Sequence, residues 1–318
     1  MRARIYLEDN FFNTFKNYEA SQNIFENDTK TENKNRLVDI LNNSEIHLPI
    51  SDREAIKIHK KLSQNYVPSD AREYYIFRAI RNNRLKLNPI DQNKPFSLFF
   101  LDKIDDDIIN FNTCNNLISL GINYNFTNPI IPKSFASREV NKEMVGINSI
   151  NHRCRNALII DPYLFEDQSR MEPKIPNVIK LLKELYFDNT NSDCHLSLLI
   201  NNPGNNGKIE SKIKAIKEGI NNPKLKISVY AHKEGLLKNN RFLITDYSII
   251  DSQHLFDRDA SISFASLYDG EINKNFIRVN NLLEIIKEDF NTTPIHIGTI
   301  KYKFDNILDN GLFEELEI

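Results

Sequence analysis

Short apolar runs alternate with amphipathic segments along the chain, and this alternation is typical of an α/β fold. In the first half, the runs predicted as strands are 4–10, 46–50, 95–102 and 122–126. Apolar residues recur three or four positions apart in the segments predicted as helices, which are 11–25, 36–41, 51–62, 68–84 and 108–121. The polar stretch 26–34 is expected to connect two of these helices. The pattern predicts a mainly parallel sheet flanked by helices.

The second half shows the same alternation in a more regular form. Its buried runs 157–161, 195–200 and 226–230 are separated by amphipathic segments at 175–187 and 208–220. A β-α-β-α-β order predicts parallel strands with right-handed crossovers. Further on, 241–245 and 247–250 are expected to form a hairpin that turns near Asp246. The tail is predicted to add strands at 262–267 and 295–302 and a helix at 279–290.

The boundary between the halves is expected at a stretch with little periodicity. Residues 131–151 follow a Pro-containing break and are predicted to be a linker. The predicted units are therefore 1–130 and 152–318, each with a mainly parallel sheet flanked by helices. A length of 318 residues fits two domains of ordinary size.

Composition and charge limit the partners that the protein can bind. The chain is 40% hydrophobic and 26% charged, as in an ordinary globular protein, and its net charge is -2. This balance gives no global basic footprint, so any nucleic-acid binding must use a local basic patch. Arg78, Arg81 and Arg84 lie three residues apart and form either a solvated helix face or a track for a phosphate backbone.

Cysteine usage and hydropathy bear on the compartment. Cys114, Cys154 and Cys194 are far apart, odd in number and without the paired spacing of a zinc site, which favours a reducing cytoplasm. The first ten residues carry charges within a strand-like run, so no signal peptide is expected. No apolar run reaches the roughly 18 residues of a membrane span, and we expect a cytoplasmic protein without membrane contact.

The segment 239–257 combines the predicted hairpin with a phosphate-type motif. Its spacing Asn239-x-Arg241-x4-Asp246 matches the His-x-Lys-x4-Asp motif of the phospholipase D-like phosphodiesterases and nucleases, and this half of the chain resembles that family. In the family the His attacks phosphorus and the Lys holds phosphate oxygens. Here Asn239 stands in place of the nucleophile, and an amide nitrogen is not nucleophilic. The resemblance therefore implies a degenerate domain.

The replacement of the family histidine by Asn239 does not remove the residues expected to bind phosphate. Arg241 offers a planar fork of donors that matches two phosphate oxygens. The resemblance assigns phosphate binding to Arg241, Asp246 and His254, where His254 lies near the position of a Gly-Ser pair in the family. The family site uses two motifs, and the sequence has no second copy. The alternative is a hairpin in which Arg241 and Asp246 form an ordinary salt bridge.

Acidic residues in the first half suggest a second chemistry. Asp9, Glu54, Asp70 and Asp102 fall at predicted strand ends or helix starts, an order that loosely resembles the PIN-like metal-dependent nucleases. Such carboxylates can hold Mg²⁺ or Mn²⁺, which activates a water for phosphodiester cleavage. The resemblance implies catalytic roles for Asp9, Glu54 and Asp102, with Asp9 and Asp102 as metal ligands. Glu54 is equally explained as the third residue of a capping box begun by Ser51.

Two functional hypotheses follow. The first is a metal-dependent nuclease that cleaves RNA or DNA, with the second half as a phosphate-binding platform; by analogy, this pairing suits a bacterial defence or toxin system. The second is a non-catalytic nucleic-acid-binding or scaffold subunit of a multi-protein defence complex, which needs a protein partner. Both predict phosphate affinity near Arg241, and only the first predicts metal-dependent turnover.

Overall fold

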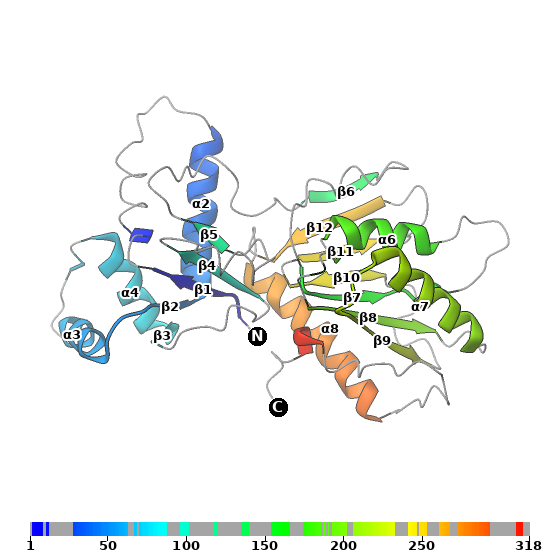
Figure 1. Ribbon diagram of the computed structural model, residues 1–318. Coiled ribbons are helices and arrows are strands. Elements are labelled where there is room, and N and C mark those ends of the chain that lie inside the picture. The colour runs from blue at the N-terminus through cyan, green and yellow to red at the C-terminus, as the bar shows by residue number, and fades with distance from the viewer. Residues whose placement is uncertain are drawn as a thin grey trace.

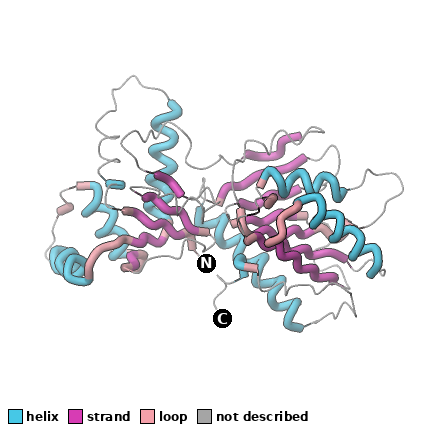
Figure 2. The backbone as a smooth tube through the Cα atoms, viewed as in Figure 1, coloured by secondary structure: helices cyan, strands magenta, loops and turns pink. Residues whose placement is uncertain are grey.

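The computed structural model contains two β-sheets with helices packed around them (Figure 1). It describes residues 2–8, 11–12, 28–62, 67–68, 70–87, 96–101, 117–119, 135–139, 154–165, 174–185, 187–188, 190, 193–201, 206–232, 241–246, 248–252, 261–267, 272–292 and 310–313. The strands of the two sheets form two separate groups (Figure 2). The prediction of an α/β chain built from two units is confirmed.

The first sheet is parallel throughout, in the order β3-β2-β1-β4-β5. In chain order its strands are β1 Arg4–Leu7, β2 Glu45–His47, β3 Leu85–Lys86, β4 Ser97–Leu101 and β5 Leu117–Ser119. The helices between these strands are α2 Asp28–Asn43, α3 Asp52–Leu62 and α4 Ala71–Arg81. The apolar side chains of Ile5, Leu7 and Phe100 are fully buried, which fixes β1 and β4 at the centre of this unit.

The second sheet is mixed, in the order β6-β12-β11-β10-β7-β8-β9. Its strands are β6 Phe135–Glu139, β7 Asn156–Ile160, β8 Cys194–Asn201, β9 Leu225–His232, β10 Phe242–Thr245, β11 Ser248–Ser252 and β12 Ser261–Ser266. The predicted parallel strands are β7, β8 and β9, and the predicted hairpin is β10 with β11. The strands β10, β11, β12 and β6 extend this parallel part in antiparallel pairings.

Three helices and one short 3₁₀ turn accompany the second sheet in the described residues. They are α6 Lys174–Glu184, α7 Asn206–Ile220, α8 Ile272–Thr292 and η2 Gly311–Phe313. Figure 1 shows α6 and α7 side by side, in agreement with their contacts. The inward face of α6 consists of Ile175, Val178, Leu181 and Leu182, at the spacing of an amphipathic helix.

The two units are in direct contact. The backbone N–H of Phe96, just before β4, donates to the carbonyl of Asp246 at 3.2 Å, and its ring packs against Phe276 of α8 with 5.7 Å between centroids. Asn273 of α8 also donates to Asn43 at the end of α2. The buried apolar side chains of both units belong to one connected core.

Several predicted elements differ from the structure. The helix α2 begins at Asp28, within the stretch predicted as a connection. The sequence of its first residues is polar, so the apolar spacing that predicts a helix starts only near Leu37, which is buried together with Ile40 and Leu41. Leu117–Ser119 is a strand rather than part of a helix, since short apolar runs are ambiguous between the two. Strand β6 lies within the predicted linker and pairs with β12.

Other predictions fall outside the described residues. These are the first strand beyond Glu8, the helix over 13–25, the helical segment 108–116, the strand at 122–126, the rest of the predicted linker and the strand at 295–302.

Candidate functional site

The carboxyl end of β7 brings together residues that are far apart in the sequence. Asp161 follows the last residue of β7, and Arg241 precedes the first residue of β10. These two strands are antiparallel neighbours, with Phe242 opposite Ile160. The start of β10 therefore lies at the same sheet edge as the end of β7, and Arg241 is placed beside Asp161.

Asp161 is the centre of the cluster. Its side chain is fully buried, and Oδ1 accepts from the backbone N–H of Tyr163 at 2.9 Å. Lys174, the first residue of α6, places Nζ 3.2 Å from Oδ2. Arg241 places Nε 3.5 Å from Oδ1. The guanidinium of Arg241 also lies over the ring of Tyr163, with Cζ 5.4 Å from the centroid.

The charges in this cluster explain its geometry. A carboxylate removed from water is costly unless cations and hydrogen-bond donors surround it, and Asp161 has both. The side chains of Lys174 and Arg241 are each 10% exposed, so both cations are held in place next to Asp161. A fixed pair of cations at a strand edge can bind an anion with little loss of side-chain entropy.

Asp246 lies at the other end of β10. Its Oδ2 accepts from the backbone N–H groups of Arg155 and Asn156 at 2.7 and 2.9 Å, and its Oδ1 accepts from the Asn156 amide at 2.8 Å. Burial raises the pKa of the Asp246 carboxyl, while the hydrogen bonds from Asn156 and Arg155 act in the opposite direction. The carboxylate anchors the start of β7 to the end of β10.

The alternative of a salt bridge between Arg241 and Asp246 is therefore not the arrangement found. Four strand residues separate them, which corresponds to more than about 13 Å along an extended chain. Arg241 instead pairs with Asp161, and Asp246 is bonded to Asn156. The motif spacing is preserved in the sequence, but the fold places its last two members at opposite edges of the sheet.

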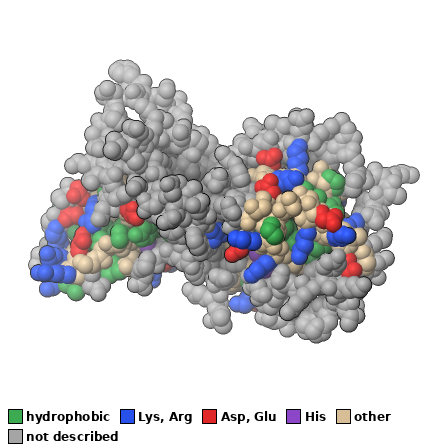
Figure 3. All heavy atoms as spheres, in the orientation of Figure 1, with side chains coloured by type: hydrophobic (Ala, Val, Ile, Leu, Met, Phe, Trp, Pro, Cys, Tyr) green, Lys and Arg blue, Asp and Glu red, His purple; other side chains and the backbone are tan. Residues whose placement is uncertain are grey.

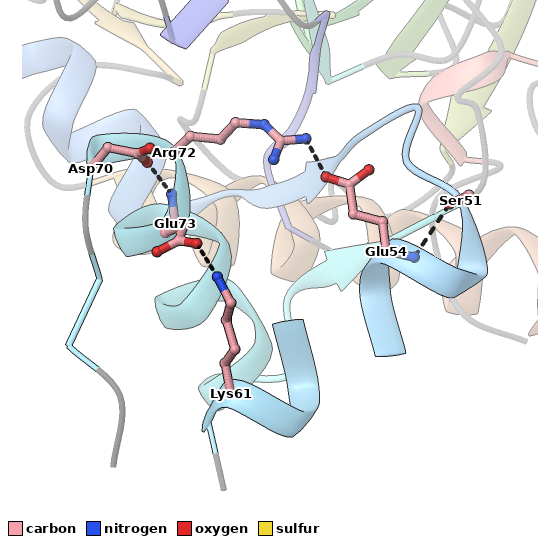
Figure 4. Close-up of polar contacts among 6 residues, drawn as sticks. All are labelled: Ser51, Glu54, Lys61, Asp70, Arg72 and Glu73. Carbon is pink, nitrogen blue, oxygen red and sulfur yellow. Dashed lines mark hydrogen bonds and ion pairs between the residues drawn. The ribbon is translucent and has the colours of Figure 1, made fainter. Parts of the chain in front are cut away.

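Glu54 has a structural explanation. Its backbone N–H donates to Ser51 Oγ at 3.3 Å, which confirms Ser51 as the N-cap of α3 (Figure 4). Its carboxylate accepts from Arg72 of α4 at 2.9 Å. Asp70 likewise caps α4 by accepting from the N–H of Glu73 at 2.8 Å. Both acids are engaged in holding α3 and α4.

The remaining predicted site residues lie outside the described part of the chain. These are Asp9, Asp102, Asn239 and His254. The strands that precede the two acids are nevertheless parallel neighbours, and Leu7 pairs with Phe100. Asp9 and Asp102 each follow these paired residues by two positions in the sequence. Within the residues that the structure does describe, no three or more His, Cys, Asp or Glu side chains form a group able to hold a metal ion.

Arg84 does not continue the predicted basic ridge. It lies beyond the end of α4 and is buried, and its Nη1 donates to the carbonyls of Ser44 and Leu41 at 2.6 and 3.2 Å. Burial lowers the pKa of Arg84. The third cation of the ridge is therefore a core side chain that ties β3 to the end of α2.

Asp161, Tyr163 and Lys174 are not among the site residues predicted from the sequence. The signal for Asp161 was present, because it ends a buried strand just as Asp9 and Asp102 follow predicted strands. Lys174 carries no such signal, since its position beside Asp161 depends on where α6 packs. The contact between Arg241 and Asp161 depends on the register of β10 against β7.

A scan against models of known protein families finds no match for this chain, and a search of curated proteins finds none either. Among the helices in the described ranges, none is long and apolar enough to cross a membrane.

Proposed function

We propose that the second unit binds a phosphate group of a nucleic acid at Arg241 and Lys174. The supporting observation is the Asp161 cluster, in which one buried carboxylate orients two cations at the edge where β7 ends. Parallel strands commonly place ligand sites at their carboxyl ends. The resemblance of the 239–246 motif to a phosphodiesterase motif supports a phosphodiester as the source of the anion.

The chemistry of the two cations suits this role. Arg241 is held at Nε by Asp161 and at its face by Tyr163, so the direction of its guanidinium fork is fixed. A guanidinium binds two phosphate oxygens at once, whereas the Lys174 ammonium acts as a point charge. Together they supply binding without a nucleophile, which agrees with Asn239 in place of the family histidine.

The test compares three variants by fluorescence anisotropy with a labelled single-stranded oligonucleotide over a series of salt concentrations. Arg241→Ala should weaken binding and reduce the salt slope by about 0.7, because one phosphate contact is lost. Arg241→Lys keeps the charge beside Asp161 but loses the fork, so affinity should fall while the slope stays. Lys174→Ala should reduce affinity and slope as Arg241→Ala does.

The matched control is Lys214→Ala, which removes a cation that is also ion-paired, to Glu218 of α7 at 3.7 Å. It should leave affinity and slope unchanged. If Arg241→Ala lowers the melting temperature but binds the oligonucleotide as the wild type does, the cluster is a structural ion-pair network and the proposal fails.

A second function is favoured by one observation in the first unit. Strands β1 and β4 are parallel neighbours with Leu7 opposite Phe100, and Asp9 and Asp102 each lie two positions further along the sequence. Carboxylate oxygens are the ligands that Mg²⁺ or Mn²⁺ prefers. We infer a metal-dependent phosphodiesterase site at Asp9 and Asp102. The ion would supply an activated water and offset phosphate charge. Glu54 is left out of the ligand set because Arg72 holds its carboxylate.

This second function has its own test. Asp9→Asn and Asp102→Asn should each abolish cleavage of single-stranded RNA or DNA by the purified protein in Mg²⁺ or Mn²⁺, and should also weaken Mn²⁺ binding measured by calorimetry. Glu54→Gln is the matched control, and it should keep both properties. Cleavage that persists in EDTA, or in the Asp9→Asn and Asp102→Asn double variant, would exclude the metal site.

A further inference from the structure

The helix α3 presents three different faces. Ile58 is 5% exposed and, with the partly buried Ala55, packs against the core. Glu54 and Lys61, two turns apart, face α4 and form ion pairs with Arg72 at 2.9 Å and with Glu73 at 2.6 Å (Figure 4). A third face carries exposed cations at positions i, i+4 and i+7, which are Arg53, Lys57 and Lys60.

The helix α4 repeats this division. Its inward face holds Tyr75, Ile76 and Ala79, all buried. Its outward face carries exposed residues at the same i, i+4, i+7 spacing, which are Tyr74, Arg78 and Arg81. Arg78 Nη1 donates to the hydroxyl of Tyr74 at 3.2 Å, and Tyr74 is 46% exposed. An aromatic side chain is thus held at the surface beside the guanidinium group of Arg78.

Three acids on or beside these helices make contacts within the α3–α4 pair. Glu54 and Glu73 are engaged in the ion pairs between α3 and α4, and Asp70 caps α4. The six outward residues named above are five cations and one tyrosine. The whole chain has a net charge of -2, so positive charge is concentrated locally. Figure 3 shows Lys and Arg side chains gathered at the end of the molecule where α3 lies.

We propose that these six residues, the α3–α4 basic surface, bind a single strand of nucleic acid. The inference extends the proposed nucleic-acid function to the first unit and rests on it for the class of ligand. The three cations of α3 lie one helical turn apart over about 10 Å, and the two cations of α4 are also one turn apart, over about 4.5 Å. This spacing matches a ligand with regularly repeated charge better than a single phosphate. The exposed ring of Tyr74 can stack on a base, and stacking requires a base that is unpaired.

The test measures anisotropy of a labelled 20-nucleotide single strand with the full chain over a salt series. Arg53→Ala with Lys57→Ala, and separately Arg78→Ala with Arg81→Ala, should each reduce the slope of log K against log salt by about 1.4, since each removes two phosphate contacts. Tyr74→Ala should weaken binding about 5- to 150-fold without changing the slope. All these side chains are exposed, so the variants should melt as the wild type does.

The control is Lys214→Ala with Lys217→Ala, which removes two exposed cations from α7 and changes the net charge equally. It should keep the wild-type slope. The proposal is overturned if both double variants of the surface keep the slope of this control, or if a duplex of the same sequence binds more tightly than the single strand. It is also overturned if acidic vesicles or polyglutamate displace the single strand from the wild type and the same substitutions weaken that displacement. If the surface variants change the salt slope and Arg241→Ala does not, only the proposed phosphate site at Arg241 is overturned. If Arg241→Ala changes the slope and the surface variants do not, only the α3–α4 basic surface is overturned.

Discussion

At the scale of single residues, Asp246 fixes the start of a strand by accepting three hydrogen bonds. Asp246→Ala would leave the N–H groups of Arg155 and Asn156 and the Asn156 amide without this acceptor. An unsatisfied buried donor costs about 1–3 kcal/mol, so we expect a loss of about 3 kcal/mol or more in the free energy of unfolding. Asp246→Asn keeps one acceptor oxygen and should lose less. Urea unfolding monitored by circular dichroism measures both, and equal losses would contradict this account.

Glu45 gives a pH-dependent prediction. The hydrogen bond with His47 lowers the pKa of the Glu45 carboxyl most, and attraction to His47, Lys86 and Arg4 adds to it, while burial acts in the opposite direction. Because the folded pKa lies below the ordinary value of 4.5, this group stabilises the fold fully above that pH and stops doing so as pH falls through the folded pKa. Glu45→Gln should therefore reduce stability at pH 7 and make its decline between about pH 5 and pH 3 shallower. Unfolding curves that stay parallel to wild type across this range would contradict the prediction.

The candidate site was predictable at this scale only in part. The sequence identified Arg241 from motif spacing, but its acidic partner in the fold is Asp161 rather than Asp246. Spacing along a strand says which residues are close in the chain, whereas the partner across the sheet depends on the β7–β10 register. That register is fixed by tertiary packing, which no local pattern encodes.

At the scale of elements, the contact between α6 and α7 depends on a glycine. A Cβ added to Gly219 would lie 2.6 Å from Cδ1 and 3.0 Å from two further carbons of Ile179. Alanine in place of glycine normally stabilises a helix by about 1 kcal/mol, but overpacking costs about 1–3 kcal/mol. Gly219→Ala should therefore be destabilising, and adding Ile179→Ala should recover part of the loss. A double-mutant cycle by chemical denaturation gives the coupling energy, and purely additive effects would show that α6 and α7 adjust freely.

The success of element prediction follows the strength of the local pattern. Strands β7, β8 and β9 are mainly apolar runs separated by amphipathic helices, so both their existence and their parallel pairing were predictable. The two-residue strand β3 and the edge strand β6 carry no such run, because pairing with β2 and β12 defines them. Short strands defined by their neighbours are beyond what periodicity can show.

At the scale of the whole molecule, Phe96 joins the two units. Its carbonyl accepts from Arg4 of β1, its N–H donates to Asp246, and its ring contacts Phe276 of α8. The side chain is fully buried, and the backbone has a φ of 59°, a region that bulky residues rarely adopt. A strained conformation of this kind persists only where surrounding contacts hold it. The sequence predicted two units, but it gave no sign that this residue connects them.

Phe96→Ala should remove the ring contact and lower the free energy of unfolding by about 3–5 kcal/mol. Part of this loss is a weaker interaction between the two units. Calorimetry of the variant should then show two unfolding transitions where the shared core of the wild type gives one. Phe96→Gly loses the same ring but relieves the positive φ, so it should be at least as stable as Phe96→Ala, the reverse of the usual order. Leu98→Ala, in β4 and buried at 3% exposure, is the control: it should lower stability of the first unit without the glycine advantage. If Phe96→Gly is clearly less stable than Phe96→Ala, the backbone at residue 96 is not strained.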